Sequence, residues 1–329
     1  MKFDWWLTGI CFGRALSQTV TMVYAAALPV LQREWEMSAA GAGAISSGYQ
    51  IGYAISLLVI SSLADRIGAR FLFIASTVSG AALTSVFAFF ARDSLSAFIL
   101  YTLVALAIGG SYTTGLILLS EKYAPERRGM ATGFYIASSS LGYFLSLFLS
   151  GLTIPAGGYQ LSFFATCGAT IVGGVLTWIT LAGTPETVVV RQRQQSFKKE
   201  VLTNQPAMLF IGAYTAHCWE LLGMWAWAPA FMTACAVAQG NEGLGAAGTG
   251  AYIAAGFHLA GLVASFSMGA LSDRLGRARV ILVLASISMV CSFVFGWMIG
   301  LPFFLIILAG VLYSFTSLGD SPVLSVGLT

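Results

Sequence analysis

The sequence predicts an all-α membrane protein, a helical bundle with six helices in its first half and an incomplete second half of four. Three observations predict this class. Hydrophobic residues make up 57% of the 329 residues and charged residues only 9%, whereas soluble domains carry about 25% charged residues. The apolar runs reach the roughly 20 residues that an α-helix needs to cross a bilayer. A polar motif also occurs twice, which indicates two related halves.

The chain contains ten apolar runs of membrane-spanning length. Hydrocarbon cannot satisfy free backbone amides, and runs of this length form helices rather than the roughly ten-residue strands of a barrel. The first run is long enough to remain as an anchor, so we expect no cleaved signal peptide. The predicted spans are 5–30, 40–62, 71–91, 95–119, 130–152, 160–182, 206–236, 247–270, 280–299 and 302–327.

The distribution of Lys and Arg predicts how the chain is oriented. With the amino terminus in the cytoplasm, the inner loops hold thirteen basic residues and the outer loops hold only Arg33 and Arg92. This asymmetry follows the positive-inside rule. We therefore expect a multi-pass protein of the plasma membrane, a bacterial inner membrane, with both termini cytoplasmic and lipid as its surroundings. The polar segment 183–205 is the predicted cytoplasmic linker between an N-terminal half, 1–182, and a C-terminal half, 206–329.

The repeated motif separates the second and third spans, and again the eighth and ninth. Leu63, Asp65, Arg66 and Gly68 recur 208 residues later as Leu271, Asp273, Arg274 and Gly276. The offset carries span 2 onto span 8. That is a six-helix period, and it argues against the two five-helix repeats of drug/metabolite-type transporters.

Both copies resemble the signature loop of the major facilitator superfamily of secondary transporters. The first copy departs from the family pattern with Ser61 in place of the usual glycine. The resemblance implies alternating access around a site near the membrane midplane. It also implies conformational gating by Asp65, Arg66, Gly68, Arg70, Glu121, Asp273, Arg274 and Gly276.

The resemblance also predicts particular contacts of these loops. Asp273 should approach the amino end of the fifth helix near Gly129 in an outward-open state, and Arg66 or Arg70 should lie near Glu121. The six-helix period leaves helices 11 and 12 of the family without a counterpart here. We therefore expect these residues to be part of a longer protein, or to be completed by an oligomer or another subunit.

Nothing in the sequence indicates an enzyme. It has no nucleotide-binding loop and no metal-ligand cluster, and it has only two histidines. We expect no cofactor, no metal and no nucleic-acid partner. The five cysteines lie in apolar runs and are predicted to be free thiols. The candidates for chemistry are the ionisable groups inside spans, which are costly in hydrocarbon and functional by default. They are Arg14, His217, Glu220, His258 and Asp320.

Arg14 is the main candidate for substrate binding. Its guanidinium stays charged and offers a fork of donors that suits a carboxylate. Gln18 and Thr21 follow at helical spacing on the same face. The alternative is a structural ion pair of Arg14 with Asp320 or Glu220. In the resembling family, helices 1, 4, 7 and 10 line the cavity, which adds four further substrate-binding candidates: Tyr112, Tyr214, Trp219 and Asp320.

Glu220 and His217, three residues apart, are the candidates for proton coupling, with His258 as a third. A carboxylate at bilayer depth can take up and release a proton, as a proton carrier must. The alternatives are a fixed hydrogen-bonded role for the pair and a core position for His258. The sequence thus predicts a permease that moves a small anionic or zwitterionic solute, a symporter with a proton.

Two other functions remain open from the sequence. One is a drug or metabolite efflux antiporter, although the run Ser138–Phe144 lacks the proline that such antiporters carry on helix 5. The other is a non-transporting membrane subunit or sensor that needs a partner.

Overall fold

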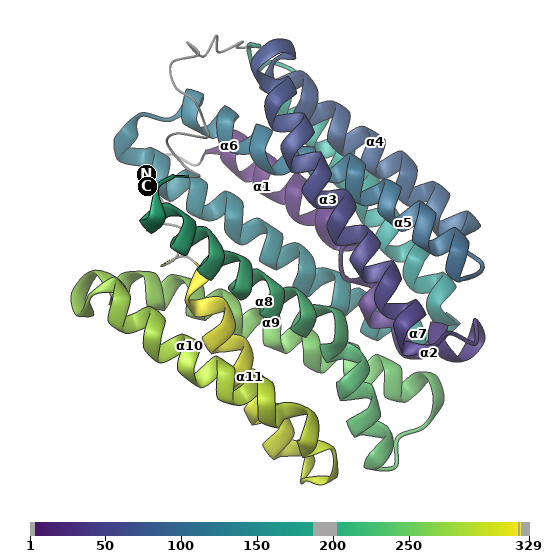
Figure 1. The fold of residues 1–329 in the computed structure, drawn as a ribbon. Coiled ribbons are helices and arrows are strands. Elements are labelled where there is room, and N and C mark those ends of the chain that lie inside the picture. The colour runs from purple at the N-terminus through teal and green to yellow at the C-terminus, as the bar shows by residue number, and fades with distance from the viewer. Residues whose placement is uncertain (1–3, 187–202, 322, 324–329) are drawn as a thin grey trace.

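The computed structural model describes residues 4–186, 203–321 and 323. Every regular element in this described part is helical, which confirms the all-α class (Figure 1). The elements are α1 (Trp5–Ser17), η1 (Gln18–Val20), α2 (Val23–Glu34), α3 (Ala39–Ile67), α4 (Ala69–Phe90), α5 (Ser94–Ile108), α6 (Gly110–Lys122), α7 (Pro125–Leu181), α8 (Gln205–Ala238), α9 (Gly243–Leu275), α10 (Arg277–Val294), η3 (Phe295–Gly300) and α11 (Phe303–Gly319).

The helices occupy the predicted apolar runs, with three differences of continuity. The first run divides into α1, η1 and α2, the fourth into α5 and α6, and the ninth into α10 and η3. The fifth and sixth runs are the two helices of α7, which fold back on each other at Gly157 and Gly158, so that the Ser162 hydroxyl donates to Ser150 Oγ at 2.8 Å. Gly158 has a φ of 69°, a conformation that glycine adopts without steric cost. Within the described residues, seven helical segments are long and apolar enough to cross a membrane. The protein is therefore a multi-pass membrane protein, and the count of ten spans stays a prediction.

Side-chain caps fix where several helices begin. Asp4 accepts a hydrogen bond from the backbone N–H of Leu7 at 3.0 Å. The Asp93 carboxylate accepts two hydrogen bonds, from the backbone N–H groups of Leu95 and Ser96. The Ser96 hydroxyl in turn accepts from the Asp93 backbone N–H, which completes a capping box. Such caps satisfy amide groups that have no partner inside the helix. They place the helix starts outside the apolar runs, where water can reach the remaining amides.

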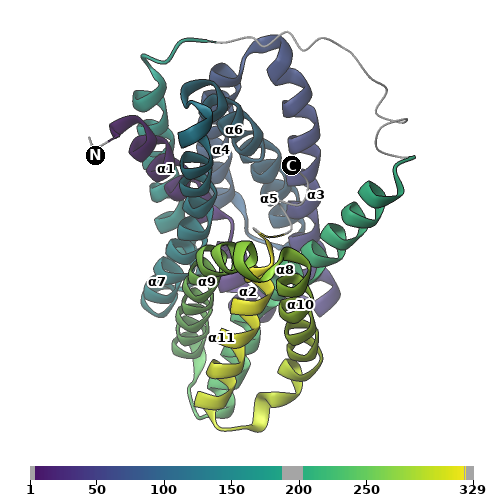
Figure 2. The ribbon, with the colours of Figure 1, turned by 90° about the vertical axis from the view of Figure 1, so that its left-hand side faces the viewer.

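The helices form two bundles that lie side by side, with α1–α7 in one half and α8–α11 in the other (Figures 1 and 2). Helices α7 and α9 join the halves at one end. A methyl group on Gly151 would lie 2.9 Å from the ring of Tyr252, and one on Gly248 would lie 2.9 Å from the Gly151 carbonyl oxygen. Backbones therefore approach closely at this end, which we call the closed end.

The same two helices are separate at their other ends. Gly129 and Gly133 in α7, and Gly269 and Gly276 near the end of α9, would find no atom within 4 Å of an added methyl group. Both signature loops belong to this side of the bundle, which we call the open end. Access to the space between the halves is therefore from the end that carries the signature loops.

The first signature loop is held by a residue that the sequence analysis did not single out. The Glu186 carboxylate accepts the backbone N–H groups of Arg70 and Phe71, each at 3.0 Å, at the amino end of α4. The Arg70 guanidinium donates to the carbonyls of Leu181 at 2.8 Å and Ala182 at 3.0 Å. Negative charge is favoured at a helix amino end and positive charge at a carboxyl end. The two residues thus fasten the start of α4 to the end of α7.

The contacts predicted for the two signature loops stay predictions. Among the described residues, neither Arg66 nor Arg70 makes a hydrogen bond or ion pair with Glu121, because the Arg70 side chain is turned toward the end of α7. The side chain of Asp273 lies outside the described part. Most of the predicted linker, 187–202, lies outside it as well.

We expect Gly68→Ala to lower the free energy of unfolding by about 2 kcal/mol. Gly68 has a φ of 105°, which strains any residue with a side chain, and an added methyl group would collide with the Glu186 carboxylate. Thermal unfolding in detergent can be followed by labelling of the buried thiols Cys167 and Cys235. Gly129→Ala is the matched control, and equal unfolding temperatures for the two variants would show that the loop tolerates a side chain.

Candidate functional site

Arg14 lies in the interior of the N-terminal half and is only 2% exposed. Its guanidinium donates hydrogen bonds to three hydroxyl oxygens: Ser139 Oγ at 2.9 Å, Ser111 Oγ at 3.1 Å and the Tyr135 hydroxyl at 3.0 Å. It also lies over the rings of Tyr135, 4.5 Å from the centroid, and Tyr112, at 5.3 Å. Such ring faces attract a cation. Arg14 is therefore held by neutral groups from α6 and α7.

The ion pair considered for Arg14 is absent from the described part of the chain. Asp320 instead lies against His217, with 3.1 Å between Oδ1 and Nδ1. Glu220 accepts a hydrogen bond from Ser288 at 2.5 Å. Both carboxylates belong to the other half. A buried charge that is balanced only by hydroxyls and ring faces is costly, and an anion at this position would offset that cost.

Small residues bring Arg14 to its partners. A methyl group on Gly13 would lie 3.2 Å from the Gly173 carbonyl oxygen, and one on Gly142 would lie 2.5 Å from the Ala15 carbonyl oxygen. Small residues at helix crossings allow such close approach in membranes. Since α1 packs this tightly on α7, Ser139 comes within reach of the Arg14 side chain. The sequence analysis gave these glycines no role, although their shared small size was the available signal.

The predicted neighbours Gln18 and Thr21 lie beyond the end of α1, in and just after the single turn η1. The Thr21 hydroxyl donates to Gln18 Oε1 at 2.7 Å and lies 2.9 Å from the Tyr49 hydroxyl. Gln18 is 1% exposed, and its Nε2 has no hydrogen-bond acceptor among the described residues. The Gln18 side-chain NH₂ group is therefore able to donate a hydrogen bond to a further group.

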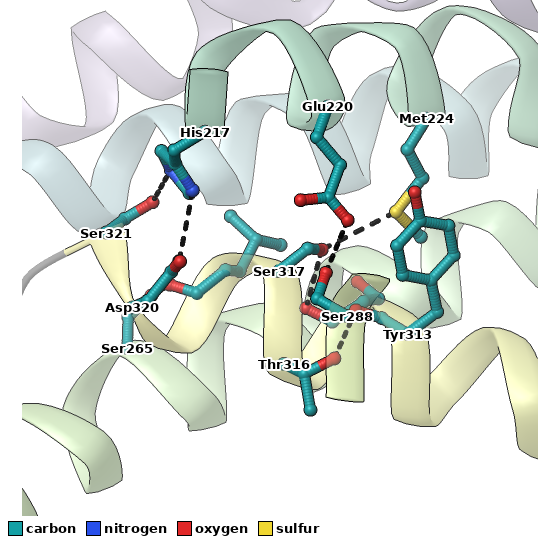
Figure 3. A network of polar contacts seen from close by, with 12 residues as sticks. His217, Glu220, Met224, Ser265, Ser288, Tyr313, Thr316, Ser317, Asp320 and Ser321 are labelled. Atoms are coloured by element: carbon teal, nitrogen blue, oxygen red, sulfur yellow. Dashed lines mark hydrogen bonds and ion pairs between the residues drawn. The ribbon is translucent and has the colours of Figure 1, made fainter. Parts of the chain in front are cut away.

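The other predicted charged residues gather in the C-terminal half, between α8, α10 and α11 (Figure 3). His217 lies between Asp320 and the Ser321 hydroxyl, which is 2.6 Å from its Nε2. Glu220, one turn further along α8, points to Ser288 of α10. The structure therefore brings His217 together with Asp320. The sequence had assigned the first to proton coupling and the second to substrate binding.

The remaining predicted residues are distributed differently. The Tyr214 ring lies 5.8 Å from His217. Trp219 is 84% exposed and, two residues from His217, projects from the opposite side of α8. His258 is buried, and its ring packs against the rings of Tyr143 and Trp225.

His258 belongs to an aromatic cluster where the two halves meet. Its ring centroid lies 5.8 Å from that of Tyr143 in α7 and 5.2 Å from that of Trp225 in α8, and the last two are 5.2 Å apart. We call Tyr143, Trp225 and His258 the junction cluster. Tyr143 lies one helical turn beyond Ser139, which accepts a hydrogen bond from Arg14. The junction cluster thus adjoins the Arg14 site and includes residues from both halves.

A groove of about 790 Å³ runs between α1 and α7 and touches Leu262 of α9. Its lining includes Asp4 and Arg127 near the open end and reaches Ser138, which precedes the Arg14 partner Ser139. Most of the wall between them is apolar. The groove is therefore a route from the open end toward the interior of the N-terminal half.

Two helical halves around buried charges, joined at one end and separate at the other, have the architecture of a secondary transporter. The family model of the Major Facilitator Superfamily matches residues 10–326, and the chain belongs to that superfamily. This confirms the resemblance carried by the two signature loops. It also identifies the chain as a transport protein and not an enzyme.

Relatives and solved structures agree with this family. The chain is 26% identical over 299 residues, 89% of its length, to a Bacillus subtilis protein assigned by name to niacin/nicotinamide transport, and it covers 72% of that protein. It is 28% identical over 159 residues to the gallate transporter of Pseudomonas putida, and 26% identical over 147 residues to the benzoate transport protein of Acinetobacter baylyi. These two matches cover 48% and 43% of this chain and about a third of each relative, 35% and 31%.

Among solved structures, a bacterial homolog of the human lysosomal transporter Spinster superposes with a TM-score of 0.70 at 14% identity, covering 96% of this chain and 73% of that one. The nucleoside transporter NupG gives a TM-score of 0.74 at 15% identity, with coverages of 98% and 82%. At this level of identity, the likeness concerns the fold. The family model and the named relatives together make the chain a secondary transporter of the superfamily for a small organic solute.

Proposed function

We propose that this transporter moves small aromatic carboxylates together with a proton, by alternating access. The observation that carries the proposal is the buried Arg14 guanidinium, which has only neutral partners in the described part of the chain. A substrate carboxylate would accept its charge-assisted hydrogen bonds. Such bonds are roughly twice as strong as those between neutral groups.

The surroundings of Arg14 support an aromatic substrate. The rings of Tyr112 and Tyr135 flank the guanidinium, and the junction cluster adds three more rings nearby. A flat substrate ring can stack on such faces or meet their edges. Three of the solutes in the relatives' names support the same class, because niacin, gallate and benzoate each combine one six-membered aromatic ring with a carboxylate; the first relative is also named for nicotinamide, the corresponding amide.

The C-terminal half supports proton coupling through the pair His217 and Asp320. Asp320 is 5% exposed, so an ionised carboxylate there depends on a protonated His217 for compensation. A proton taken up by this pair changes the charge of the C-terminal half, just as a bound carboxylate changes the charge of the N-terminal half. The buried site in each half can be enclosed at a lower free-energy cost once its charge is compensated. Solute and proton would therefore cross together.

Uptake into proteoliposomes with an imposed pH gradient tests this function. With the outside one pH unit more acidic, we expect nicotinate and benzoate to accumulate, while the neutral amide nicotinamide does not. Accumulation driven by an acidic interior would instead identify an antiporter. Equal transport of nicotinamide would overturn the anion site at Arg14, and no uptake of any of the three would favour the non-transporting alternative.

A further inference from the structure

Trp225 carries a buried hydrogen-bond donor that nothing in the described part of the chain uses. Its indole Nε1–H is shielded from solvent and has no acceptor. Buried indole N–H groups ordinarily find a partner, because leaving one unmade loses the hydrogen bond that water provided. A buried donor without an acceptor calls for an explanation, and a bound ligand that supplies the acceptor is one.

This donor lies where the two halves meet. The rings of the junction cluster are inclined to one another by 47° to 67°, so they meet at angles and do not form a parallel stack. They come from α7, α8 and α9, so a movement of the halves against each other would change their contacts and uncover the donor.

A second unused donor lies in the same neighbourhood. Gln18 packs against Gly142, since a methyl group there would lie 2.7 Å from the Gln18 Cβ atom. Trp225 contacts Tyr143, the next residue on α7. Two buried donors from opposite halves, Gln18 Nε2 and Trp225 Nε1, therefore belong to residues that contact successive positions of α7, about one turn beyond the Arg14 partner Ser139.

We propose that Gln18 and Trp225 form a second subsite, which recognises a hydrogen-bond acceptor on the aromatic ring of the solute. This inference rests on the proposed function. Arg14 holds the carboxylate, and the ring extends past Tyr143 so that a ring nitrogen or a ring hydroxyl oxygen meets the indole N–H. Aromatic carboxylates with such an acceptor are then preferred over benzoate, which has none.

The expected preference follows from the unused donors. A site with a buried donor rejects an analogue that lacks the acceptor, because binding then leaves the donor unpaired. For one neutral hydrogen bond we expect about a tenfold ratio of uptake efficiency for nicotinate or 4-hydroxybenzoate over benzoate. Trp225→Phe keeps an aromatic ring and removes the donor. It should reduce the ratio to about one.

The test measures initial rates for the three acids in proteoliposomes of the full chain and its variants. Trp297→Phe, the same change at a tryptophan that is 87% exposed in η3, is the matched control and should keep the wild-type ratio. Gln18→Met removes the second donor at similar size and should also lower the ratio. If Trp225→Phe unfolds at a lower temperature than wild type in detergent, the uptake ratio of Gln18→Met tests the subsite in its place.

Three results would overturn the inference. Equal uptake of the three acids by the wild-type protein, or a slowing of all three by the same factor in Trp225→Phe, would remove the subsite and leave the proposed function intact. Transport of none of the acids by the wild-type protein would overturn the proposed function and the subsite together.

Discussion

Arg14→Lys is expected to lower carboxylate uptake by about 100-fold or more, since a lost charge-assisted contact in a buried site costs several kcal/mol. The guanidinium reaches Ser139 through Nε and two further hydroxyls through one terminal nitrogen. A compact ammonium cannot reach these oxygens from the same place, nor lie flat over the rings of Tyr112 and Tyr135. Initial rates of benzoate uptake in proteoliposomes measure the effect.

The control for this substitution is Arg33→Lys at an exposed position, which should leave uptake unchanged. Both variants should insert and fold, because lysine keeps the positive charge and the aliphatic part of the side chain. Wild-type uptake by Arg14→Lys, with normal unfolding temperatures for both proteins, would assign Arg14 to helix packing alone.

Asp320→Asn is expected to abolish proton-driven accumulation and to preserve exchange of solute for solute. One pH unit corresponds to about 1.4 kcal/mol, a factor of ten, so coupling to one proton gives about tenfold accumulation in the wild-type protein. Asparagine has the size of aspartate and can still contact His217, but it cannot become ionised. The concentration ratio at steady state should therefore fall to about one.

Two further variants locate the proton. Asp93→Asn changes an exposed capping aspartate in the same way and should leave accumulation intact. Glu220→Gln distinguishes the second buried carboxylate, which has its own hydroxyl partner in Ser288. If Asp320→Asn still accumulates solute and Glu220→Gln does not, the proton travels on Glu220.

The sequence was sufficient for the helices and the family because both depend on local patterns. Apolar runs of bilayer length have one stable backbone form in hydrocarbon, so each predicted run contains helix. The two signature loops are short and contiguous, so their spacing could be compared directly. The turn between the two helices of α7, at Gly157 and Gly158, falls between the predicted runs 130–152 and 160–182.

The site was predicted less completely because its contacts join distant segments. Arg14 was identified by its position within an apolar run, but its partners come from two other helices, α6 and α7. Any of the many Ser, Thr and Tyr residues in the predicted spans could have been its hydrogen-bond partner. The alternative of an ion pair between the halves could not be decided from the sequence for a similar reason. The positions of these charged residues along their spans indicate a similar depth in the membrane. They do not show that His217 contacts Asp320 while Arg14 contacts Ser139.

The closed end also has a mechanical consequence. The contact there consists of Gly151, Tyr252, Gly248 and Pro155, and none of these four side chains carries a charge. Such a contact resists compression but hardly resists rotation, because tilting one helix over the other breaks no directional bond. It can therefore act as a fulcrum. A small roll of α9 on α7 at this point is amplified along both long helices into a large separation at their far ends. The size of this separation depends on the lengths of the two helices beyond the contact, and the residues at the fulcrum can stay in contact throughout the movement.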